Sequence, residues 1–425
     1  MLRIIPSASI GVLFAAQRSL FLDYLTAVSG SAGRLVFSLV YFIALANTLS
    51  IADFGLFATA SSAGVMLSRL LAFGFISALY RVATVKPRLI GTYSAGFLLL
   101  AVLSLPVMAL ASYAVFGVFF HGVMALAVFS LFILAEALLW RPVEVVLIVN
   151  NGMGRYGRAA MMAIAGTALR AAAALLFALQ PRHDLGMWAF FYLGANAVSL
   201  ASALILLYPR QRLRLDIRLY WRRLADSIYV AGAEVLFYLQ MEFDKLLVLS
   251  FGGAELAGIY AIIMRLVDLT AIPIRTFTMM LVQKMMRAPE LLKRMKLRVS
   301  IEAGVFAIST LALAVLGGLL HYFPTLLGRN VAEAAPLVLL ALLVPGLRNL
   351  VEYQAELLFA RGQTFVRAIN LGLLTGVKAV ALVYVLTRVG STQDLVLWLN
   401  AVFVALFAAS ALLTHSALRL PAKTI

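Results

Sequence analysis

Residues 91–117 read GTYSAGFLLLAVLSLPVMALASYAVFG and contain no Asp, Glu, Lys or Arg. A helix needs about 20 mostly apolar residues to cross the hydrocarbon core of a bilayer, so this stretch is long enough to do so. A run of this kind predicts a transmembrane helix and therefore a chain whose solvent is lipid as much as water.

Eleven further apolar runs flank this one on both sides. They cover residues 25–49, 54–79, 122–149, 158–179, 187–208, 226–250, 256–282, 299–322, 335–360, 365–387 and 394–417. Hydrophobic residues make up 64% of the 425 residues and charged residues only 12%, about half the share in soluble domains. The sequence predicts an all-α polytopic membrane protein with twelve transmembrane helices and no large soluble domain.

The loops between these runs differ in charge. Those on one side, together with the two terminal segments, carry 23 Lys and Arg, whereas the other side has only Arg182, Arg329 and Arg388. Loops rich in Lys and Arg stay in the cytoplasm, so we expect a multi-pass protein with both termini cytoplasmic. The net charge of +17 would also suit nucleic acid, but the basic runs are short and lie between spans, so no nucleic-acid partner is expected.

Several chemistries find no support in the sequence. There are no cysteines, and the four histidines are scattered rather than spaced as metal ligands. Neither a Gly-x-x-x-x-Gly-Lys-Ser/Thr phosphate loop nor a Gly-x-Ser-x-Gly elbow is present. We therefore expect no catalytic residues, no metal, no cofactor and no enzymatic activity.

The two halves of the chain resemble each other. An offset of 208 residues superposes Glu144 on Glu352 and Arg170 on Lys378. Because six spans return the chain to its starting side, the halves would be parallel repeats related by an axis along the membrane normal. The sequence predicts two parallel, pseudo-symmetric six-helix bundles around a central cavity.

The expected domain boundaries follow from these runs. They are a lead-in segment at 1–24, an N-terminal lobe at 25–208, a basic cytoplasmic linker at 209–225, a C-terminal lobe at 226–417 and a cytoplasmic tail at 418–425. The lead-in has the apolar length of a signal peptide but no well-placed cleavage site, so an interfacial or partly buried helix is the preferred interpretation.

Cations in the middle of the spans are the strongest functional signal. They are Arg69, Arg141, Arg170, Arg265, Arg348 and Lys378. A charge at that depth costs about 2.5 to 3.5 kcal/mol on insertion scales, so six of them indicate a wet, positive cavity that receives an anion. Arg34 and Arg275 lie nearer the cytoplasmic half and are either vestibule residues or side chains that snorkel to the surface.

Pairing with acids is the alternative use of these cations. Arg141 has Glu144, and Arg348 has Glu352, about one turn away on the same predicted helix. Such pairs would tie helices together instead of binding a ligand.

The remaining cations are the better ligand candidates. Arg69, Arg170 and Lys378 have no acid within one turn of their own helix. We take Arg170 with Lys378, and Arg69 with Arg265, as the strongest candidates for an anionic head group.

Carboxylates within the spans can instead carry a coupling ion, because burial suits them to reversible protonation. The candidates for this role are Asp268, Glu234, Glu144 and Glu352.

Several segments resemble a known family. They are LSIADFGLFA at 49–58, FDKLLVLS at 243–250, GIYA at 258–261 and ARGQ at 360–363. These segments are similar to the polysaccharide-transporter branch, which includes the O-antigen flippases, of the multidrug/oligosaccharidyl-lipid/polysaccharide exporter superfamily. The loose match extends over nearly the whole chain, and its motifs are structural rather than catalytic.

The resemblance implies a flippase of the bacterial inner membrane. Its substrate would be an anionic polyprenyl-diphosphate-linked oligosaccharide, moved by alternating access coupled to protons or voltage. Glycan polymerase and chain-length proteins would be its partners. Alternatives are a multidrug or lipid II type exporter of the same superfamily, or a membrane-embedded glycan polymerase or glycosyltransferase.

Overall fold

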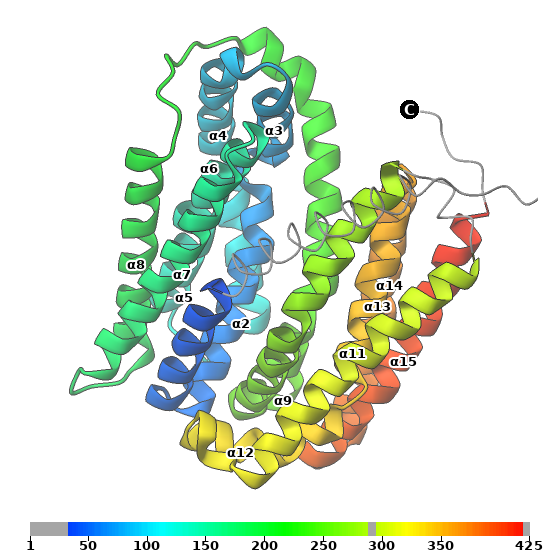
Figure 1. Ribbon diagram of the computed structural model, residues 1–425. Coiled ribbons are helices and arrows are strands. Elements are labelled where there is room, and N and C mark those ends of the chain that lie inside the picture. The colour runs from blue at the N-terminus through cyan, green and yellow to red at the C-terminus, as the bar shows by residue number, and fades with distance from the viewer. Residues whose placement is uncertain (1–32, 288–294, 420–425) are drawn as a thin grey trace, which may run out of the picture.

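The computed structural model describes residues 33–287 and 295–419, and within these ranges the chain is helical with no strand. The predictions for the lead-in segment at 1–24 and for the tail beyond residue 419 lie outside the described residues. Figure 1 shows long helices running between two ends of an elongated bundle. The predicted all-α class is confirmed.

The first half contains six crossings. Their elements are the helix Gly33–Thr48, α2 (Ile51–Leu67), η1 (Ser68–Gly74), α3 (Ile76–Val85), η2 (Pro87–Leu89), α4 (Ile90–Phe119), α5 (Leu126–Ile133), η3 (Leu134–Trp140), α6 (Arg141–Gly152), α7 (Tyr156–Ala178) and α8 (Leu185–Leu206). The helices α2, η1 and α3 together form span two, and α5, η3 and α6 form span four.

The second half contains the other six. Its elements are α9 (Ile217–Arg287), α11 (Met295–Tyr322), η4 (Pro324–Leu327), α12 (Arg329–Val338), η5 (Leu339–Ala341), α13 (Val344–Ala360), α14 (Thr364–Arg388) and α15 (Thr392–Ala417). The elements α12, η5 and α13 correspond to predicted span ten.

The helix α9 holds two crossings, because it doubles back at Gly253. This glycine has a φ of 78°, a conformation that glycine adopts at little cost. Tyr260 donates a 2.6 Å hydrogen bond to Asp244, 16 residues earlier, although a straight helix would separate them by about 24 Å. We call residues 217–252 the first arm of α9 and residues 254–287 the second arm.

Eight helices among the described residues are long and apolar enough to cross a membrane, and a bent pair in span ten adds a ninth. The doubling of α9, the interrupted span four and the helix Gly33–Thr48 account for the other three. The twelve-helix architecture is thus consistent with the structure.

Three spans are interrupted inside the bundle. Span two breaks at Leu71, Ala72 and Phe73, which have non-helical backbone angles. Span four widens into a π-helix at Leu134–Trp140, and span ten bends by 66° between η5 and α13. The offset of 208 residues maps the π-helix onto residues 342–348, which begin at the span ten bend, so these two irregularities are pseudo-equivalent.

Serine side chains cap the N-termini of two helices. Ser50 accepts a hydrogen bond from the backbone of Asp53, and Ser391 accepts one from Asp394 in the same three-residue spacing. These contacts satisfy helix N–H groups that lack a partner within the helix. They fix the starts of α2 and α15 at the end of the bundle where the two halves meet.

The halves form two lobes. The N-lobe comprises the helix Gly33–Thr48 through α8, and the C-lobe comprises the second arm of α9 through α15. Figure 1 shows them close together at the α12 end and apart at the opposite end, where α3 meets α4. We call these the closed end and the basic end.

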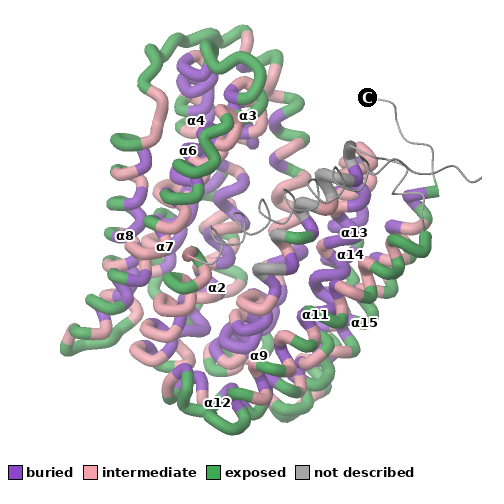
Figure 2. The backbone as a smooth tube through the Cα atoms, in the orientation of Figure 1, coloured by how far each residue is buried: buried purple, intermediate pink, exposed green. Residues whose placement is uncertain are grey.

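Polar and close contacts join the lobes at the closed end. The Asn330 side chain donates to the backbone oxygens of Ala46 and Leu49 at 2.7 and 2.8 Å. A Cβ atom on Gly258 would lie only 2.0 Å from the oxygen of Ile51, so α2 and α9 touch through backbone. Consistent with this central position, the apolar part of span two is 72% buried, whereas that of α4 is 17% buried (Figure 2).

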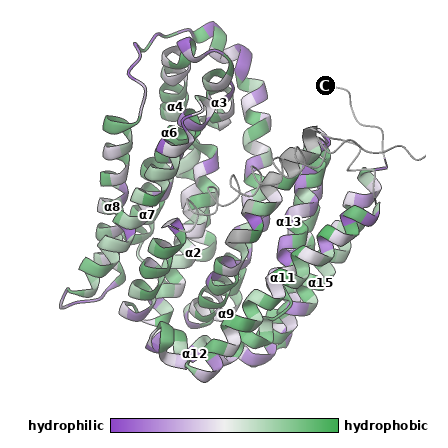
Figure 3. Cartoon of the chain, in the orientation of Figure 1, coloured by the Kyte–Doolittle hydropathy of each residue, from purple (hydrophilic) through white to green (hydrophobic). Residues whose placement is uncertain are grey.

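The connection between the lobes crosses the basic end, where Figure 3 shows hydrophilic residues above largely hydrophobic helices. Gln211 donates to the oxygen of Pro87 and accepts from the nitrogen of Gly91, which fastens the connection to the start of α4. The helix α9 begins at Ile217, inside the segment predicted as a linker, so only residues 207–216 lie between helices.

Candidate functional site

Four charged side chains form a cluster on the inner side of the N-lobe. Arg141, the first residue of α6, donates to Glu144 and to Glu234 of α9, each at 2.7 Å. Arg69 of η1 donates to both oxygens of Glu144, at 3.0 and 3.4 Å. Two buried arginines therefore face two acids, and the cluster is electrically balanced.

The break in span two lies directly after Arg69. Ala72 and Phe73 have φ values of 53° and 48°, a region that costs a non-glycine residue about 1–2 kcal/mol. The Ser104 hydroxyl accepts from the nitrogen of Ala72 at 2.9 Å and so satisfies one backbone group that the break sets free. Strained backbone of this kind is concentrated at functional sites.

A second balanced group surrounds Arg170 of α7 within the N-lobe. Its guanidinium lies 3.5 Å from Glu136, donates twice to the side-chain oxygen of Asn196 and stacks 3.9 Å from the Trp140 ring centroid. Glu136 and Trp140 both belong to the π-helix η3, and Tyr192 donates a further hydrogen bond to Glu136. The π-helix thus supplies both the counter-charge and the aromatic face for one cation.

The C-lobe contains a comparable group around Lys378 of α14. The ammonium lies 2.8 Å from Asp244 and donates to the backbone oxygen of Gln240 at 2.9 Å. Tyr260 donates a hydrogen bond to the same carboxylate oxygen of Asp244, Oδ2, that lies beside the ammonium. Asp244 is 1% exposed and Lys378 5%, so each charge depends on the other for its stability in the interior.

A fourth balanced group contains Arg275, Arg348, Asp268 and Glu352. Arg275 donates to Asp268 at 3.1 Å and to Glu352 at 2.7 and 2.9 Å. Arg348 lies 3.3 Å from Asp268 and 4.0 Å from Glu352. These side chains join the second arm of α9 to α13 and leave no surplus charge.

Two of the candidate cations that the sequence singles out form no ion pair with an acid among the residues that the structure describes. Arg265, on the second arm of α9, donates a hydrogen bond to the hydroxyl of Ser38. Arg34 lies one turn before Ser38, on the same face of the first described helix, and its side chain is exposed. Its guanidinium is within electrostatic range of two cations, Arg170 and Arg265, and of one acid, Glu144. Surplus positive charge therefore gathers where the first helix of the N-lobe meets the C-lobe.

Arg265 and its hydrogen-bond partner Ser38 lie deep between the two ends of the bundle, and Arg34 lies one turn further toward the basic end. Ser38 precedes the end of its helix at Thr48 by ten residues, or about 15 Å. Arg265 follows the bend at Gly253 by twelve residues, or about 18 Å. Both positions are near the middle of a 30 Å hydrocarbon layer.

The structure brings the predicted residues together in ways that the sequence anticipates only in part. The pairs Arg141 with Glu144 and Arg348 with Glu352 are present. Arg69, Arg170 and Lys378, which lack an acid on their own helix, each meet one from another segment: Glu144, Glu136 and Asp244.

Pseudo-symmetry does not extend to the partners. Arg170 and Lys378 are equivalent in sequence, but the acid beside Arg170 comes from span four and that beside Lys378 from the first arm of α9. The cations also contact groups that are not among the predicted site residues: Ser38, Asn196 and the backbone of Gln240. Of these, only Ser38 has a sequence signal, because it lies one helical turn from Arg34.

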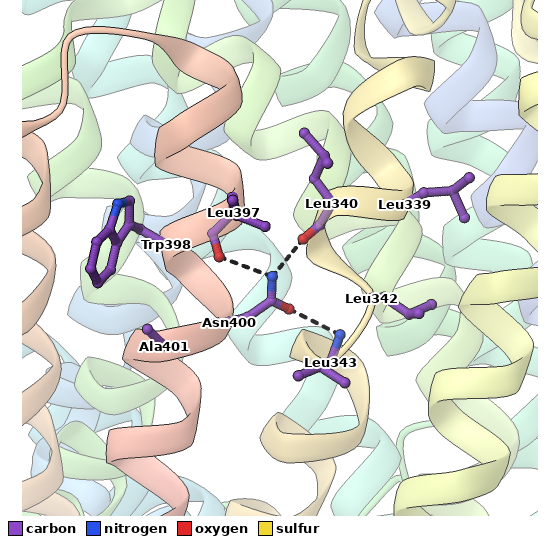
Figure 4. Close-up of a pocket in the computed structure, with 8 residues that line it drawn as sticks. All are labelled: Leu339, Leu340, Leu342, Leu343, Leu397, Trp398, Asn400 and Ala401. Atoms are coloured by element: carbon purple, nitrogen blue, oxygen red, sulfur yellow. Dashed lines mark hydrogen bonds between the residues drawn. The ribbon is translucent and has the colours of Figure 1, made fainter.

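A pocket of about 590 Å³ lies elsewhere, between the span ten bend and α15. Figure 4 shows Asn400 spanning the bend, where its side chain donates to the oxygen of Leu340 and accepts from the nitrogen of Leu343. The other lining residues are leucines, Trp398 and Ala401, so the pocket has no charge to hold an anion. Among the described residues no group of three His, Asp or Glu is arranged to bind a metal.

Comparison with solved structures places the fold. A multidrug resistance MATE family transporter of the MOP superfamily, in an inward-facing conformation, matches with a TM-score of 0.66 and 14% identity, covering 91% of this chain and 95% of that one. The chain has the fold of MATE transporters of the MOP superfamily. No protein-family model and no curated protein sequence matches it.

Two further solved structures of transporters also match this chain. A MOP superfamily transporter from Pyrococcus furiosus, whose reverse pocket polarity suggests a different function, gives a TM-score of 0.63 at 15% identity over 94% of this chain and 95% of that one. An outward-facing MATE family transporter gives 0.50 at 14% identity, over 93% and 95%. The inward-facing fold is thus matched more closely than the outward-facing one.

Proposed function

We propose that the protein is an alternating-access exporter that moves an anionic, polyprenyl-diphosphate-linked oligosaccharide across the bacterial inner membrane. The observation that carries this proposal is the pair Arg265, near the middle of the bundle, and Arg34, nearer the basic end, neither of which has an ion-pair partner among the described residues. All other mid-span cations that the sequence singles out have a carboxylate within 4.0 Å.

The charge balance decides which cations are free to bind an anion. A ligand at Arg69, Arg170 or Lys378 must displace a carboxylate that already satisfies the cation, whereas a ligand at Arg34 and Arg265 displaces none. A diphosphate supplies two adjacent phosphoryl groups, and each matches the planar donor fork of a guanidinium. In this proposal the balanced groups position the helices and the two free arginines bind the head group.

The oligosaccharide and its lipid anchor are inferred from sequence resemblance. The segments 49–58, 243–250 and 360–363 are similar to those of polysaccharide transporters. In such a cycle the polyprenyl tail stays in the bilayer while the charged head group crosses between the lobes. Proton or voltage coupling would drive the cycle, and polymerase or chain-length proteins would receive the glycan.

The orientation of the basic end supports an inward-open state. Positively charged loops remain in the cytoplasm, so both termini and the basic end would face it. The lobes are apart at that end, and the closer match to an inward-facing relative agrees with this arrangement. A cytoplasmic head group would then enter from the basic end and reach Arg34 and Arg265.

A multidrug exporter is the competing proposal, because two of the similar solved structures are of multidrug resistance transporters. Most drugs handled by such exporters are cations, which Arg34 and Arg265 would repel. An anionic substrate therefore fits the charge of this molecule better.

A deletion strain tests the function directly. We expect a lipid-linked oligosaccharide to accumulate on the cytoplasmic leaflet, where an added membrane-impermeant glycosidase cannot reach it in intact spheroplasts. Single repeat units accumulating on the periplasmic face would instead indicate a polymerase. Increased sensitivity to cationic drugs without glycan accumulation would favour the multidrug exporter.

A further inference from the structure

The first arm of α9 lies between the two lobes and contacts both. Six of its residues face the N-lobe. Tyr220 donates a hydrogen bond to Thr92, and Ser227 and Ala231 lie beside Gly74. Further along the arm, Glu234 contacts Arg141, Tyr238 contacts Arg69 and Glu242 contacts Ser62. At 100° per residue these positions fall within an arc of about 80°. One continuous face of the arm is therefore applied to the N-lobe.

The opposite face of the same arm contacts the C-lobe. Tyr229 stacks on Phe365, and Gln240 and Asp244 hold Lys378 of α14. Any movement of one lobe relative to the other must therefore break contacts along one of these two faces. The ion pair on the C-lobe face, Asp244 with Lys378, is buried, whereas the one on the N-lobe face includes the partly exposed Glu234.

The strongest polar contact on the N-lobe face is the one between Arg141 and Glu234. The Glu234 side chain is 37% exposed, which is the largest exposure among the acids of the charged groups described above. The charged and titratable groups that face it are Arg141 and Glu144 of α6, Arg69 of η1 and Tyr238 of the arm itself. This carboxylate is therefore the most accessible of these acids in the conformation described.

Arg141 has two acid partners, and this arrangement makes the contact releasable. When Glu234 takes up a proton from water it loses its charge, and its ion pair with Arg141 is lost. Arg141 and Arg69 then share Glu144, at 2.7 and 3.0 Å, so each arginine keeps an acid partner although the cluster carries one extra positive charge. Protonating Asp244 instead would strand Lys378 in the interior, which is far more costly.

We propose that Glu234 is a proton-binding site whose protonation releases the first arm of α9 from the N-lobe and so allows the lobes to change their relative position. The inference rests on the alternating-access part of the proposed function and is independent of the identity of the substrate. It assigns one carboxylate among the four coupling candidates, because Asp268 and Glu352 each have two arginines and Glu144 is held by both Arg69 and Arg141.

The absence of cysteine in the sequence permits a clean distance measurement. Val85 of α3 and Val299 of α11 are exposed and belong to different lobes. Spin labels on a V85C/V299C protein in nanodiscs report the separation of the lobes at the basic end. Between about pH 8 and about pH 5 we expect the ratio of the two conformers to change about tenfold, the value of one charge-assisted hydrogen bond.

The decisive variant is Glu234→Gln in the labelled protein. It should show at about pH 8 the distances that the parent shows at about pH 5, and it should no longer respond to pH. Glu356→Gln removes another partly exposed acid with one arginine partner, Arg367, and should retain the parent response.

Three results would overturn the proposal: a parent without a pH response, a folded E234Q protein that keeps the response, or an E356Q protein that loses it. The gel-filtration profile and thermal unfolding establish whether the E234Q protein is folded. A second variant, Arg141→Lys, keeps the charge but lacks the second donor arm, so it should shift the conformers in the same direction as E234Q. A parent that responds to pH but does not transport a lipid-linked glycan would refute the substrate and leave the proton site standing.

Discussion

The guanidinium of Arg265 donates a hydrogen bond to the hydroxyl of Ser38, and this contact joins the second arm of α9 to the first described helix of the N-lobe. Neither residue has an acid beside it among the described parts of the chain. A cation placed between the lobes without a counter-charge is available to a ligand in a way that a paired cation is not. The contact also marks where a bound head group would touch both lobes.

Replacing this cation should therefore affect binding more than stability. We expect Arg265→Gln, and likewise Arg34→Gln, to weaken binding of undecaprenyl diphosphate in nanodiscs by about 10- to 100-fold, the value of one or two charge-assisted hydrogen bonds. The unfolding temperature should not fall, because no acid loses its partner. Native mass spectrometry with added lipid measures the affinity.

Arg388→Gln provides the control for this prediction, because Arg388 is exposed at the far end of α14 and should not alter the affinity. Undiminished binding by the R265Q and R34Q proteins would refute the assignment of the head-group site.

The buried pair Asp244 and Lys378 should behave in the opposite way. Lys378→Met leaves a carboxylate that is 1% exposed without its cation, a change that typically costs about 3–5 kcal/mol. The double variant K378M/D244N should recover most of this loss, because it removes both charges. Unfolding by SDS in mixed micelles measures the difference. A K378M protein as stable as its parent would show that the pair contributes nothing to the fold.

The sequence predicts the spans well because a membrane helix requires a continuous apolar run, such as residues 91–117, which can be seen in one stretch of sequence. It predicts Arg141 with Glu144 for the same reason, since the two are neighbours on one helix. The partners of Arg170 and Lys378 come from distant segments, and no local pattern places Glu136 or Asp244 beside them. The charge of each group, and hence the identity of the free cations, follows only from the packing of helices.

The break in span two is also hidden from the sequence. The segment SRLLAFG at 68–74 has one glycine and no proline, yet Ala72 and Phe73 adopt left-handed backbone angles. Tertiary contacts such as the hydrogen bond from the nitrogen of Ala72 to Ser104 hold this conformation. Propensity alone would continue the helix through these residues.

The closed end provides a prediction about conformation. Asn330→Ala removes the hydrogen bonds that its side chain donates to the oxygens of Ala46 and Leu49. Each is worth about 1 kcal/mol, so together they should change the ratio of closed to open forms by about tenfold or more. A single cysteine in place of Leu49, which is 1% exposed, should then react faster with a maleimide.

Asn150→Ala is the matched control for this experiment, since Asn150 donates to Val146 and Leu207 within the N-lobe and does not touch the C-lobe. It should leave the labelling rate of L49C unchanged. Equal rates in the N330A and parent proteins would show that these bonds do not hold the closed end together.

Gly74 offers a test of the break in span two. Its φ of 75° already disfavours any other residue, and a Cβ atom there would lie 2.4 Å from the oxygen of Ser227 on the first arm of α9. Gly74→Ala should therefore destabilise the protein by about 1–3 kcal/mol, from left-handed strain together with displacement of the arm. Thermal unfolding in detergent measures this loss.

Gly194→Ala, in the middle of α8 with open space around it, should instead be neutral or stabilising by up to about 1 kcal/mol, because alanine is the better helix former. Equal unfolding temperatures for the two variants would mean that the arm does not pack against the break, and the N-lobe face of α9 would then have to be held by its charged contacts alone.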